Sequence, residues 1–340
     1  MKKLFAFLAC LPITFGAFSA KLTATLQSGE NVKPYYGENA LIEACEAAVD
    51  GDIITLSPGV FTTTDLEIEK SVTIYGADGF SDDDAKRTKL VNLTVSGDNV
   101  KLEGIYFSGN LTINAGDNLT INRSYIAYLR DKEKEDDKYH DNTIVNDCMI
   151  EQCYSMKLSK NAVFRNSCVG VFGELNDPEY PALIENCNIP DYTYYSSSTW
   201  VVQPYAIYRS CFLGMDFPEG NTFKNSWSFS SPSEFINCVF FPNYNDGQGI
   251  IEWSINFTSC VVENCVILTD EDPYFEPTSG NFANKYKWND MTPYIFEDIT
   301  YGPRDPKLLP SIPEITSAEI DTETDSEGVL HVKITAVARD

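Results

Sequence analysis

The chain has 340 residues, of which 43% are hydrophobic and 22% charged, a composition typical of globular rather than disordered proteins. It carries 25 lysines and arginines against 50 aspartates and glutamates, so its formal net charge is −25. A charge of this sign and size repels nucleic acid and anionic lipid, which excludes a general nucleic-acid-binding or membrane-surface role. Beyond the N-terminus, no stretch of the sequence is long and apolar enough to be expected to span a bilayer.

Residues 1–20 have the pattern of a Sec signal peptide. A basic start at Lys2 and an apolar run over 4–15 precede small residues that end at Ala20. We therefore expect a bacterial exported protein that is secreted, periplasmic or displayed at the cell surface. Cys10 lies inside the apolar run and lacks the small residues that precede a lipidated cysteine, so a lipoprotein is disfavoured.

A short helix is expected ahead of the main body of the chain. Asn39 is a favourable N-cap residue, and the apolar side chains of Leu41, Cys45 and Ala48 recur at helical spacing. Gly51 follows the segment and suits a helix end. A helix in this place can close the open end of a stack of strands, where exposed edges would otherwise invite association.

A repeat of nearly constant length begins in the next part of the chain. The motif Ser96–Asn99, followed by Val100–Phe107, returns 19 residues later as Ala115–Asn118, followed by Leu119–Ile126. Further copies of this repeat continue to Ile267. In each copy an apolar residue is followed by a turn residue, then a small residue, then further apolar residues. A fixed period of this size predicts stacked structural units.

Within each repeat, apolar residues alternate, and the alternation slips by one position at a fixed point. Val100 and Leu102 are two residues apart, whereas Leu102 and Ile105 are three apart. A tight corner must absorb the extra residue, and Gly, Asn and Asp tolerate the left-handed backbone that such a corner needs. The predicted corner residues are Gly104, Arg123, Asp147, Asn166, Asn186, Ser210 and Asn237.

Three short strands and three corners per repeat predict an all-β fold, a right-handed parallel β-helix of roughly ten coils with an N-terminal capping helix. We expect this domain, including its caps and covering loops, to span 21–312. The remaining segment, 313–340, has the pattern of two strands joined by an acidic turn. It predicts a C-terminal strand pair that forms a hairpin or cap.

The opening of the predicted domain resembles a known superfamily. Residues Ala47–Phe61 and Lys70–Gly76 are similar to the first coil of pectin-lyase-like right-handed β-helix proteins. The resemblance covers roughly residues 39–267 and implies the fold. It implies no single activity, because that superfamily includes lyases, hydrolases, esterases, adhesins and non-catalytic proteins. The sequence motifs of polygalacturonase-like hydrolases, pectate lyases and pectin methylesterases are absent from this sequence.

Cysteines recur at the small position of the repeat. The predicted inward column contains Cys148, Cys187, Cys211, Cys238 and Cys260. A linear file does not supply the four converging ligands that zinc requires, so we predict no metal site. Stacked side chains with parallel Cβ directions align poorly for disulfides, although neighbouring coils are close enough to form them. We interpret the column as buried free thiols that fill a narrow core.

An outward column beside the corner is charged and holds Arg165, Glu185, Arg209 and Lys224. We interpret it as a surface ladder of alternating charge, in which each pair contributes little to stability. The alternative is the site of a polysaccharide lyase. In that case Arg165, Arg209 or Lys224 would act as the base, with Asp141 or Glu185 near a Ca²⁺ ion that neutralises a uronate carboxylate.

Two coils are longer than the others and carry insertions. The first insertion contains several acidic residues and His140, and we interpret it as a solvated loop. The second is aromatic, and its rings are expected either to cover an apolar outward face or to stack on sugar rings. The residues assigned to glycan binding are Tyr192, Tyr194, Tyr195 and Trp200. The apolar outward residues that require a cover are Ile144, Val163, Leu183 and Ile207.

Two functional hypotheses follow from these patterns. The preferred one is an exported, non-catalytic β-helix protein that binds a glycan or a cell-surface partner through a lateral face and needs no cofactor. The alternative is a divergent Ca²⁺-dependent polysaccharide lyase that acts on a uronate-containing glycan. The excess of acidic residues favours the first, because a polyuronate would be repelled without added cations.

Overall fold

The structure is a computed structural model that describes residues 22–267 with internal gaps, together with 281–282, 314–320 and 332–337. The gaps are 64–65, 82, 84, 133–139, 155, 157–158, 173–179, 190–192, 197–198, 203–205, 217–224, 229–232, 244–252, 257–259 and 264. Within the described part of the chain, no helix is long and apolar enough to cross a membrane.

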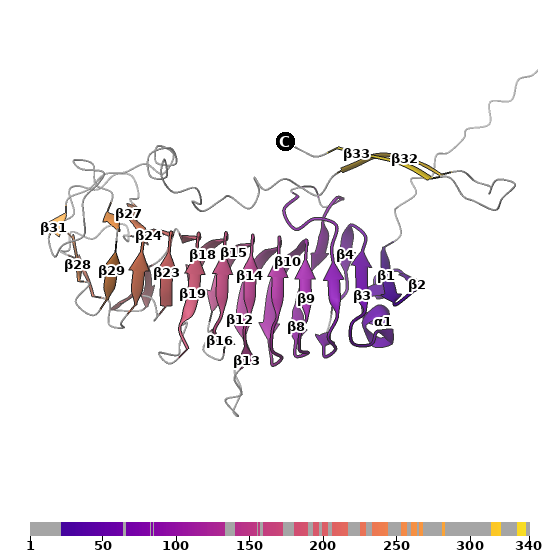
Figure 1. Ribbon diagram of the computed structural model, residues 1–340, viewed down its shortest axis with the longest axis horizontal. Helices are drawn as coiled ribbons and strands as arrows, with labels where there is room; N and C mark the ends of the chain where they lie inside the picture. Colours follow the sequence, from indigo (N-terminus) through magenta and orange to yellow (C-terminus); the bar gives the residue numbers. More distant parts are fainter. Residues whose placement is uncertain are drawn as a thin grey trace, which may run out of the picture.

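The described residues form a parallel β-solenoid in which successive coils stack side by side (Figure 1). The first long sheet consists, in order, of β2 (Asn31–Tyr36), β1 (Thr23–Ser28), β3 (Ile53–Leu56), β6 (Thr73–Tyr75), β9 (Lys101–Glu103), β11 (Thr120–Asn122), β14 (Ile144–Asn146), β17 (Val163–Arg165), β19 (Ala182–Glu185), β23 (Ala206–Arg209), β26 (Glu234–Ile236) and β29 (Val261–Glu263). From β3 to β29 every neighbouring pair is parallel.

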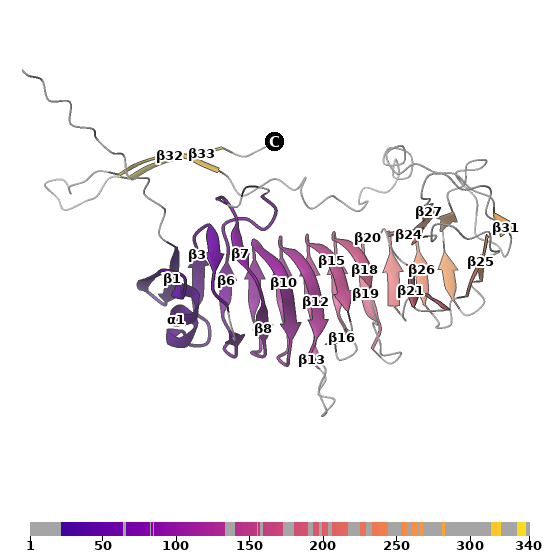
Figure 2. The same ribbon diagram turned by 180° about the vertical axis from the view of Figure 1, so that it is seen from behind.

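The second long sheet follows the same coils on another side of the solenoid (Figure 2). Its order is β30 (Val266–Ile267), β27 (Val239–Asn243), β24 (Phe212–Asp216), β20 (Asn188–Ile189), β18 (Cys168–Phe172), β15 (Met149–Tyr154), β12 (Tyr125–Asp131), β10 (Ile105–Ile113), β7 (Thr88–Leu90) and β4 (Gly59–Phe61). Two further strands, β5 (Glu67–Ile68) and β8 (Leu93–Val95), pair with each other, and β8 also pairs with β10. The all-β solenoid predicted from the repeat is therefore confirmed.

Smaller groups of strands complete the described structure. They are β13 (His140–Asp141) with β16 (Ser159–Lys160), β21 (Thr193–Ser196) with β22 (Thr199–Val202), and β25 (Asn225–Ser228) with β28 (Trp253–Asn256) and β31 (Asn281–Phe282). In addition, β32 (Glu314–Ile320) pairs antiparallel with β33 (Val332–Val337), which is the strand pair that the alternation near the C-terminus predicted.

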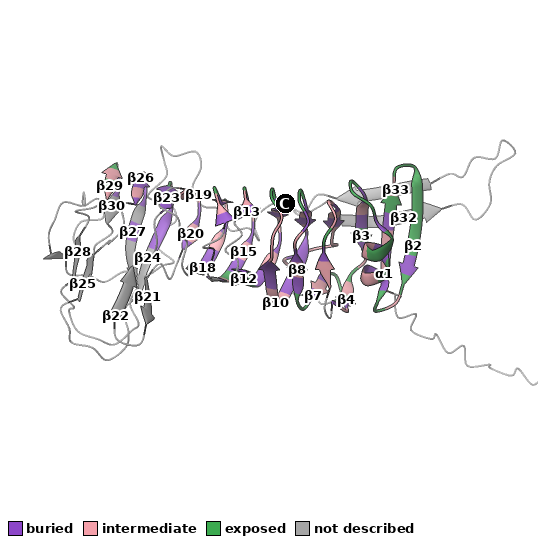
Figure 3. Cartoon of the chain, turned by 90° about the horizontal axis from the view of Figure 1, so that it is seen from below, coloured by how far each residue is buried: buried purple, intermediate pink, exposed green. Residues whose placement is uncertain are grey.

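Buried residues recur on the strands of successive coils (Figure 3), and the pairing of the strands places them in register. One such column in the first sheet is fully buried and consists of Leu102, Ile121, Val145, Phe164, Ile184, Tyr208 and Phe235. The rings of Tyr208 and Phe235 are stacked, with their centroids 5.0 Å apart. Each coil alone cannot bury its apolar face, so the column makes the coils mutually dependent for stability.

The corner residues have the backbone conformation that the slip in alternation predicted. All seven have φ between +48° and +69°, from Arg123 at the low end to Gly104 at the high end. Their amides also link the coils: the N–H of Asn166 donates to the carbonyl of Glu185, and that of Asn186 to the carbonyl of Arg209. The corner therefore sets the direction of the next strand and joins it to its neighbour.

A second left-handed column was not predicted. Asn99, Asn118, Asn142 and Asn161 have φ between +52° and +62°. The side-chain amide of Asn118 donates to Oδ1 of Asn99, and that of Asn142 donates to Oδ1 of Asn118, both at 3.0 Å. Asparagine fits here because it tolerates positive φ and also bonds along the stack.

At the N-terminal end of the solenoid, α1 (Ala40–Ala47) packs against β1, β2 and β3 with Leu41 and Ala44 buried. Asn39 stands at the N-cap position, but its side chain makes no capping hydrogen bond. The antiparallel strand β2 forms the end of the first sheet, and its exposed residues include Lys33 and Pro34. A charge and a proline on an edge strand discourage pairing with another chain.

The small position of the repeat is an inward column of hydroxyls and thiols, all of them buried. It contains Ser124, Cys148, Ser167, Cys187, Cys211, Cys238 and Cys265. The assignment of Cys260 to this column is wrong, because Phe235 pairs with Val262 and this register places Cys265 after Cys238. Cys260 is only half-buried, one position before β29.

All nine cysteines in the described part of the chain are free. The thiol of Cys148 donates to the carbonyls of Asn146 at 3.1 Å and Ile121 at 3.6 Å, and Cys187 repeats the pattern with Glu185 and Phe164. Burial raises the pKa of the Cys148 and Cys187 thiols to about 12. The interpretation as free thiols that fill the core is confirmed, and their chemistry is suppressed because the reactive thiolate is disfavoured.

These thiols predict a contrast in labelling between native and denatured protein. With the native protein, a maleimide reagent should react slowly with the buried column, because burial blocks access and holds the thiols protonated. In denaturant without reductant, all nine cysteines that the structure describes should react rapidly. Mass spectrometry counts the labels. Recovery of eight unlabelled cysteines as four disulfides would contradict the structure.

Candidate functional site

Three residues of the predicted charged column, Arg165, Glu185 and Arg209, lie in register on the first sheet, but the residue that follows Arg209 in register is Ile236 and not Lys224. Arg165 on β17 and Glu185 on β19 form an ion pair in which Nε and Oε2 are 3.0 Å apart. Arg209 on β23 follows Glu185 in register, and Lys224 lies outside the described residues. Both members of the ion pair are partly exposed, so their interaction contributes at most about 1 kcal/mol to stability.

Asp141 is not part of this column. It precedes β14, whereas Asn146, which pairs in register with Arg165, ends that strand. The amide of Asp141 donates to Oδ1 of Asp117 at 2.8 Å, and the amide of Asp117 donates to Oδ1 of Asp98 at 2.9 Å. The structure therefore brings Arg165 and Glu185 together and places Asp141 at the opposite end of the strand.

The aromatic insertion forms a hairpin. Tyr194 and Tyr195 lie on β21, and Trp200 on β22 is opposite Tyr195 in register, while Tyr192 lies outside the described residues. The hairpin strand β21 contacts β24 of the second sheet. These contacts place the hairpin beside the second sheet, whereas its aromatic rings were expected to cover the first sheet. The residues it was expected to cover, Ile144, Val163, Leu183 and Ile207, face outward from that first sheet and are half-buried.

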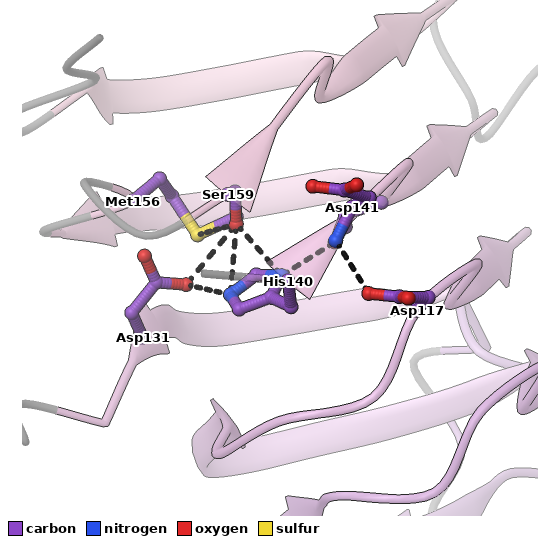
Figure 4. Close-up of polar contacts among 7 residues, drawn as sticks. Asp117, Asp131, His140, Asp141, Met156 and Ser159 are labelled. Carbon is purple, nitrogen blue, oxygen red and sulfur yellow. Dashed lines mark hydrogen bonds and ion pairs between the residues drawn. The ribbon is translucent and has the colours of Figure 1, made fainter. Parts of the chain in front are cut away.

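His140 is buried, which corrects its interpretation as part of a solvated loop. Figure 4 shows Asp131, His140 and Ser159 pointing toward one another, and they are 3%, 1% and 8% exposed. Nε2 of His140 is 2.8 Å from Oδ1 of Asp131, and the hydroxyl of Ser159 donates to the same oxygen at 3.1 Å. Asp131 follows Ile113 in an otherwise apolar inward column, and the imidazole supplies the partner that a buried carboxylate needs.

The three residues do not form a nucleophilic relay. In such a relay the acid and the hydroxyl contact opposite nitrogens of the imidazole. Here Asp131 approaches Nε2 of His140 at 2.8 Å, and the Ser159 hydroxyl lies about equally near both ring nitrogens, 3.1 Å from Nε2 and 3.3 Å from Nδ1. All three side chains are shielded from solvent, so a substrate could not reach the hydroxyl. We therefore assign the cluster a structural role, which is to hold together the coil that carries the first insertion.

The outer face of the second sheet carries an aromatic stack that the sequence analysis did not single out. The rings of Tyr106 on β10 and Tyr125 on β12 are parallel, with centroids 4.3 Å apart, and the Arg87 guanidinium lies 3.9 Å from the Tyr106 centroid. The phenol of Tyr125 donates to Glu151, and burial together with this carboxylate raises the pKa of the phenol well above its usual value. Both ring faces of Tyr106 are thus occupied by neighbours.

A groove of about 630 Å³ lies beside this stack, where β4 and β8 meet the N-terminal cap. We call it the β8 groove. Its apolar lining includes Val60, Leu66 and Val91, and its polar lining includes Thr62, Asn92 and Thr94. Val60 and Val91 are 48% and 45% exposed, so their apolar carbon atoms are accessible in the groove. Glu38, which precedes α1, also lines the groove, and its carbonyl accepts a hydrogen bond from the amide of Thr62 at 3.0 Å.

Outward polar side chains extend from the β8 groove along the second sheet. Asn92 is followed in register by Asn110, Tyr128 and Gln152 on successive coils. The amide and side chain of Asn110 both donate to Oδ1 of Asn92, at 2.8 and 3.3 Å. Hydroxyl and amide groups beside apolar carbon on a rigid sheet can recognise a ligand that has both hydroxyls and C–H faces.

The sequence analysis missed the β8 groove because its walls come from three separate segments. Glu38, Val60 and Val91 lie in different coils or in the cap, and no local pattern joins them. The chain matches no protein-family model, no curated protein and no solved structure. The described residues contain no group of three or more His, Cys, Asp or Glu side chains that could hold a metal ion.

The buried cluster predicts a large cost for losing one partner. Asp131→Ala should lower the free energy of unfolding by about 3 kcal/mol, because it leaves the buried imidazole without its acceptor. The matched control is Asp98→Ala, which removes only an exposed bond to the amide of Asp117 and should cost about 1 kcal/mol or less. Urea unfolding measures both. Equal losses for the two variants would contradict the structural role assigned to the cluster.

Proposed function

We propose that this chain is an exported, non-catalytic member of the pectin-lyase-like β-helix superfamily that binds a glycan through the β8 groove. The observation that carries the proposal is the lining itself, in which threonine hydroxyls and an asparagine amide alternate with exposed valines. A sugar ring presents hydroxyls at its edge and C–H groups on its face. These two kinds of surface match the two kinds of lining.

The size and rigidity of the β8 groove support this reading. Its volume lies within the range of roughly 300–1,000 Å³ that is usual for sites that hold small ligands. Its walls are held by hydrogen bonds between coils: the amide of Thr94 donates to the carbonyl of Leu66, and the amide of Asn92 donates to the side-chain Oγ1 of Thr63. A preformed wall lowers the ordering cost of binding.

The lyase alternative receives less support from the geometry. A lyase needs a base and a cation site that converge on one uronate unit. Arg165 is instead paired with Glu185, and Asp141 lies at the other end of the adjoining strand. Arg165, Glu185 and Asp141 therefore make contacts with neighbouring residues, whereas the β8 groove offers a concave surface for binding.

A glycan array with the mature chain, with and without Ca²⁺, tests the proposal. We expect binding to one or more glycans without added Ca²⁺. The double variant Thr62→Val/Thr94→Val keeps the shape of the groove and removes two hydroxyls, so the affinity should fall about tenfold, since each lost bond costs about 0.5–1.5 kcal/mol. The control Thr120→Val alters an outward threonine of the first sheet and should leave affinity unchanged.

The same assay, extended to detect product, tests the alternative that the protein is a polysaccharide lyase. Any glycan that binds is incubated with the protein, and unsaturated product is followed by ultraviolet absorbance. Product that forms with the mature chain and disappears with Arg209→Ala would overturn the non-catalytic proposal. Binding that is equally strong in the Thr62→Val/Thr94→Val variant would show that the glycan binds elsewhere.

A further inference from the structure

The charges around the β8 groove are unevenly distributed. Glu38 lines the groove itself. Glu67 on β5 pairs in register with Thr94, a lining residue, and its Oε1 accepts a bond of 2.5 Å from the side chain of Asn114. Two acidic residues therefore lie in or directly beside the lining.

The cations on the neighbouring strand are engaged with an aromatic ring. Lys89 pairs in register with Val60, but its Nζ lies 5.8 Å from the centroid of Tyr106. The Arg87 guanidinium lies 3.9 Å from the same centroid. These two positive charges are thus directed toward the Tyr106 ring on β10, where cation–π attraction holds them.

A ligand with its own carboxylates would meet repulsion in this groove. Two like charges about 4 Å apart in water repel by about 1 kcal/mol, which corresponds to roughly a fivefold loss of affinity per contact. The net charge of −25 adds a longer-range repulsion that slows the approach of any polyanion. A neutral sugar meets neither penalty and can still use the hydroxyl and amide lining.

We propose, on the basis of the proposed glycan-binding function, that the β8 groove selects uncharged sugars and rejects uronates, with Glu38 as the main determinant. Glu38 lies directly beside Thr62, whose amide donates to the Glu38 carbonyl at 3.0 Å, and both residues line the groove together with Thr94 of β8. The selection is electrostatic, so it weakens as salt screens the charges.

The test uses pairs of ligands that differ only in charge. Oligosaccharides of glucose, galactose and mannose are each compared with the same oligosaccharide oxidised at C6 to the uronate, by titration calorimetry with the mature chain at low salt. We expect at least one neutral oligosaccharide to bind, and its uronate form to bind about fivefold or more weakly. The difference should shrink as the ionic strength rises.

Two variants identify the residue responsible. Glu38→Gln should reduce the ratio of neutral to uronate affinity several-fold. Glu263→Gln removes an exposed carboxylate on β29, in a coil remote from the groove along the sheet, and should leave that ratio unchanged. A ratio unaffected by Glu38→Gln would overturn the role of Glu38.

The outcomes separate this inference from the function on which it rests. Binding of the uronate form as tightly as the neutral form would overturn the selectivity and leave glycan binding intact. Failure of both forms of all three sugars to bind would overturn both proposals. Weaker uronate binding that Glu38→Gln relieves would support both.

Discussion

A left-handed residue at one corner of every coil is the constraint on which the rest of this structure depends. Apolar side chains alternate along each strand, and a continuous alternation would point the wrong set of residues inward after the turn. One residue with positive φ resets the alternation, and Arg123, Asp147 and Ser210 adopt this conformation as fully as Gly104 does. The conformation costs a non-glycine residue about 1–2 kcal/mol, which the buried columns on both sides offset.

The same constraint shapes both the interior and the surface. Directly after the corner, the inward position holds a small side chain such as Ser124 or Cys148. Each of these side chains donates a hydrogen bond to the carbonyl two residues before it, at the end of the preceding strand. On the outside, the coils present straight columns of side chains, such as the ion pair of Arg165 with Glu185. The β8 groove lies at the start of these columns, where the first coils meet the segment that precedes α1.

Local patterns in the sequence predict the repeating part of the fold, because the corner and the alternation act over only a few residues. They do not predict Asp131 with His140, whose contact spans an insertion and depends on how that insertion returns to the coil. The local pattern assigned Cys260 to the last place in the thiol column, because Cys260 lies closer to Cys238 in the sequence. In the structure the amide of Cys238 contacts Cys265, which is 27 residues further along the chain. Local sequence patterns cannot predict the β8 groove, because the residues that line it come from segments that are far apart in the sequence.

The free energy of unfolding of two Ser210 variants tests the central claim most directly. Ser210 has φ of +52° and, unlike asparagine or glycine, is not a residue that favours this region. Ser210→Gly should raise the free energy of unfolding by about 1 kcal/mol, and Ser210→Val, with a branched side chain in the same conformation, should lower it by about 1–2 kcal/mol. A destabilising glycine together with a neutral valine would contradict a left-handed corner and the coil geometry built on it.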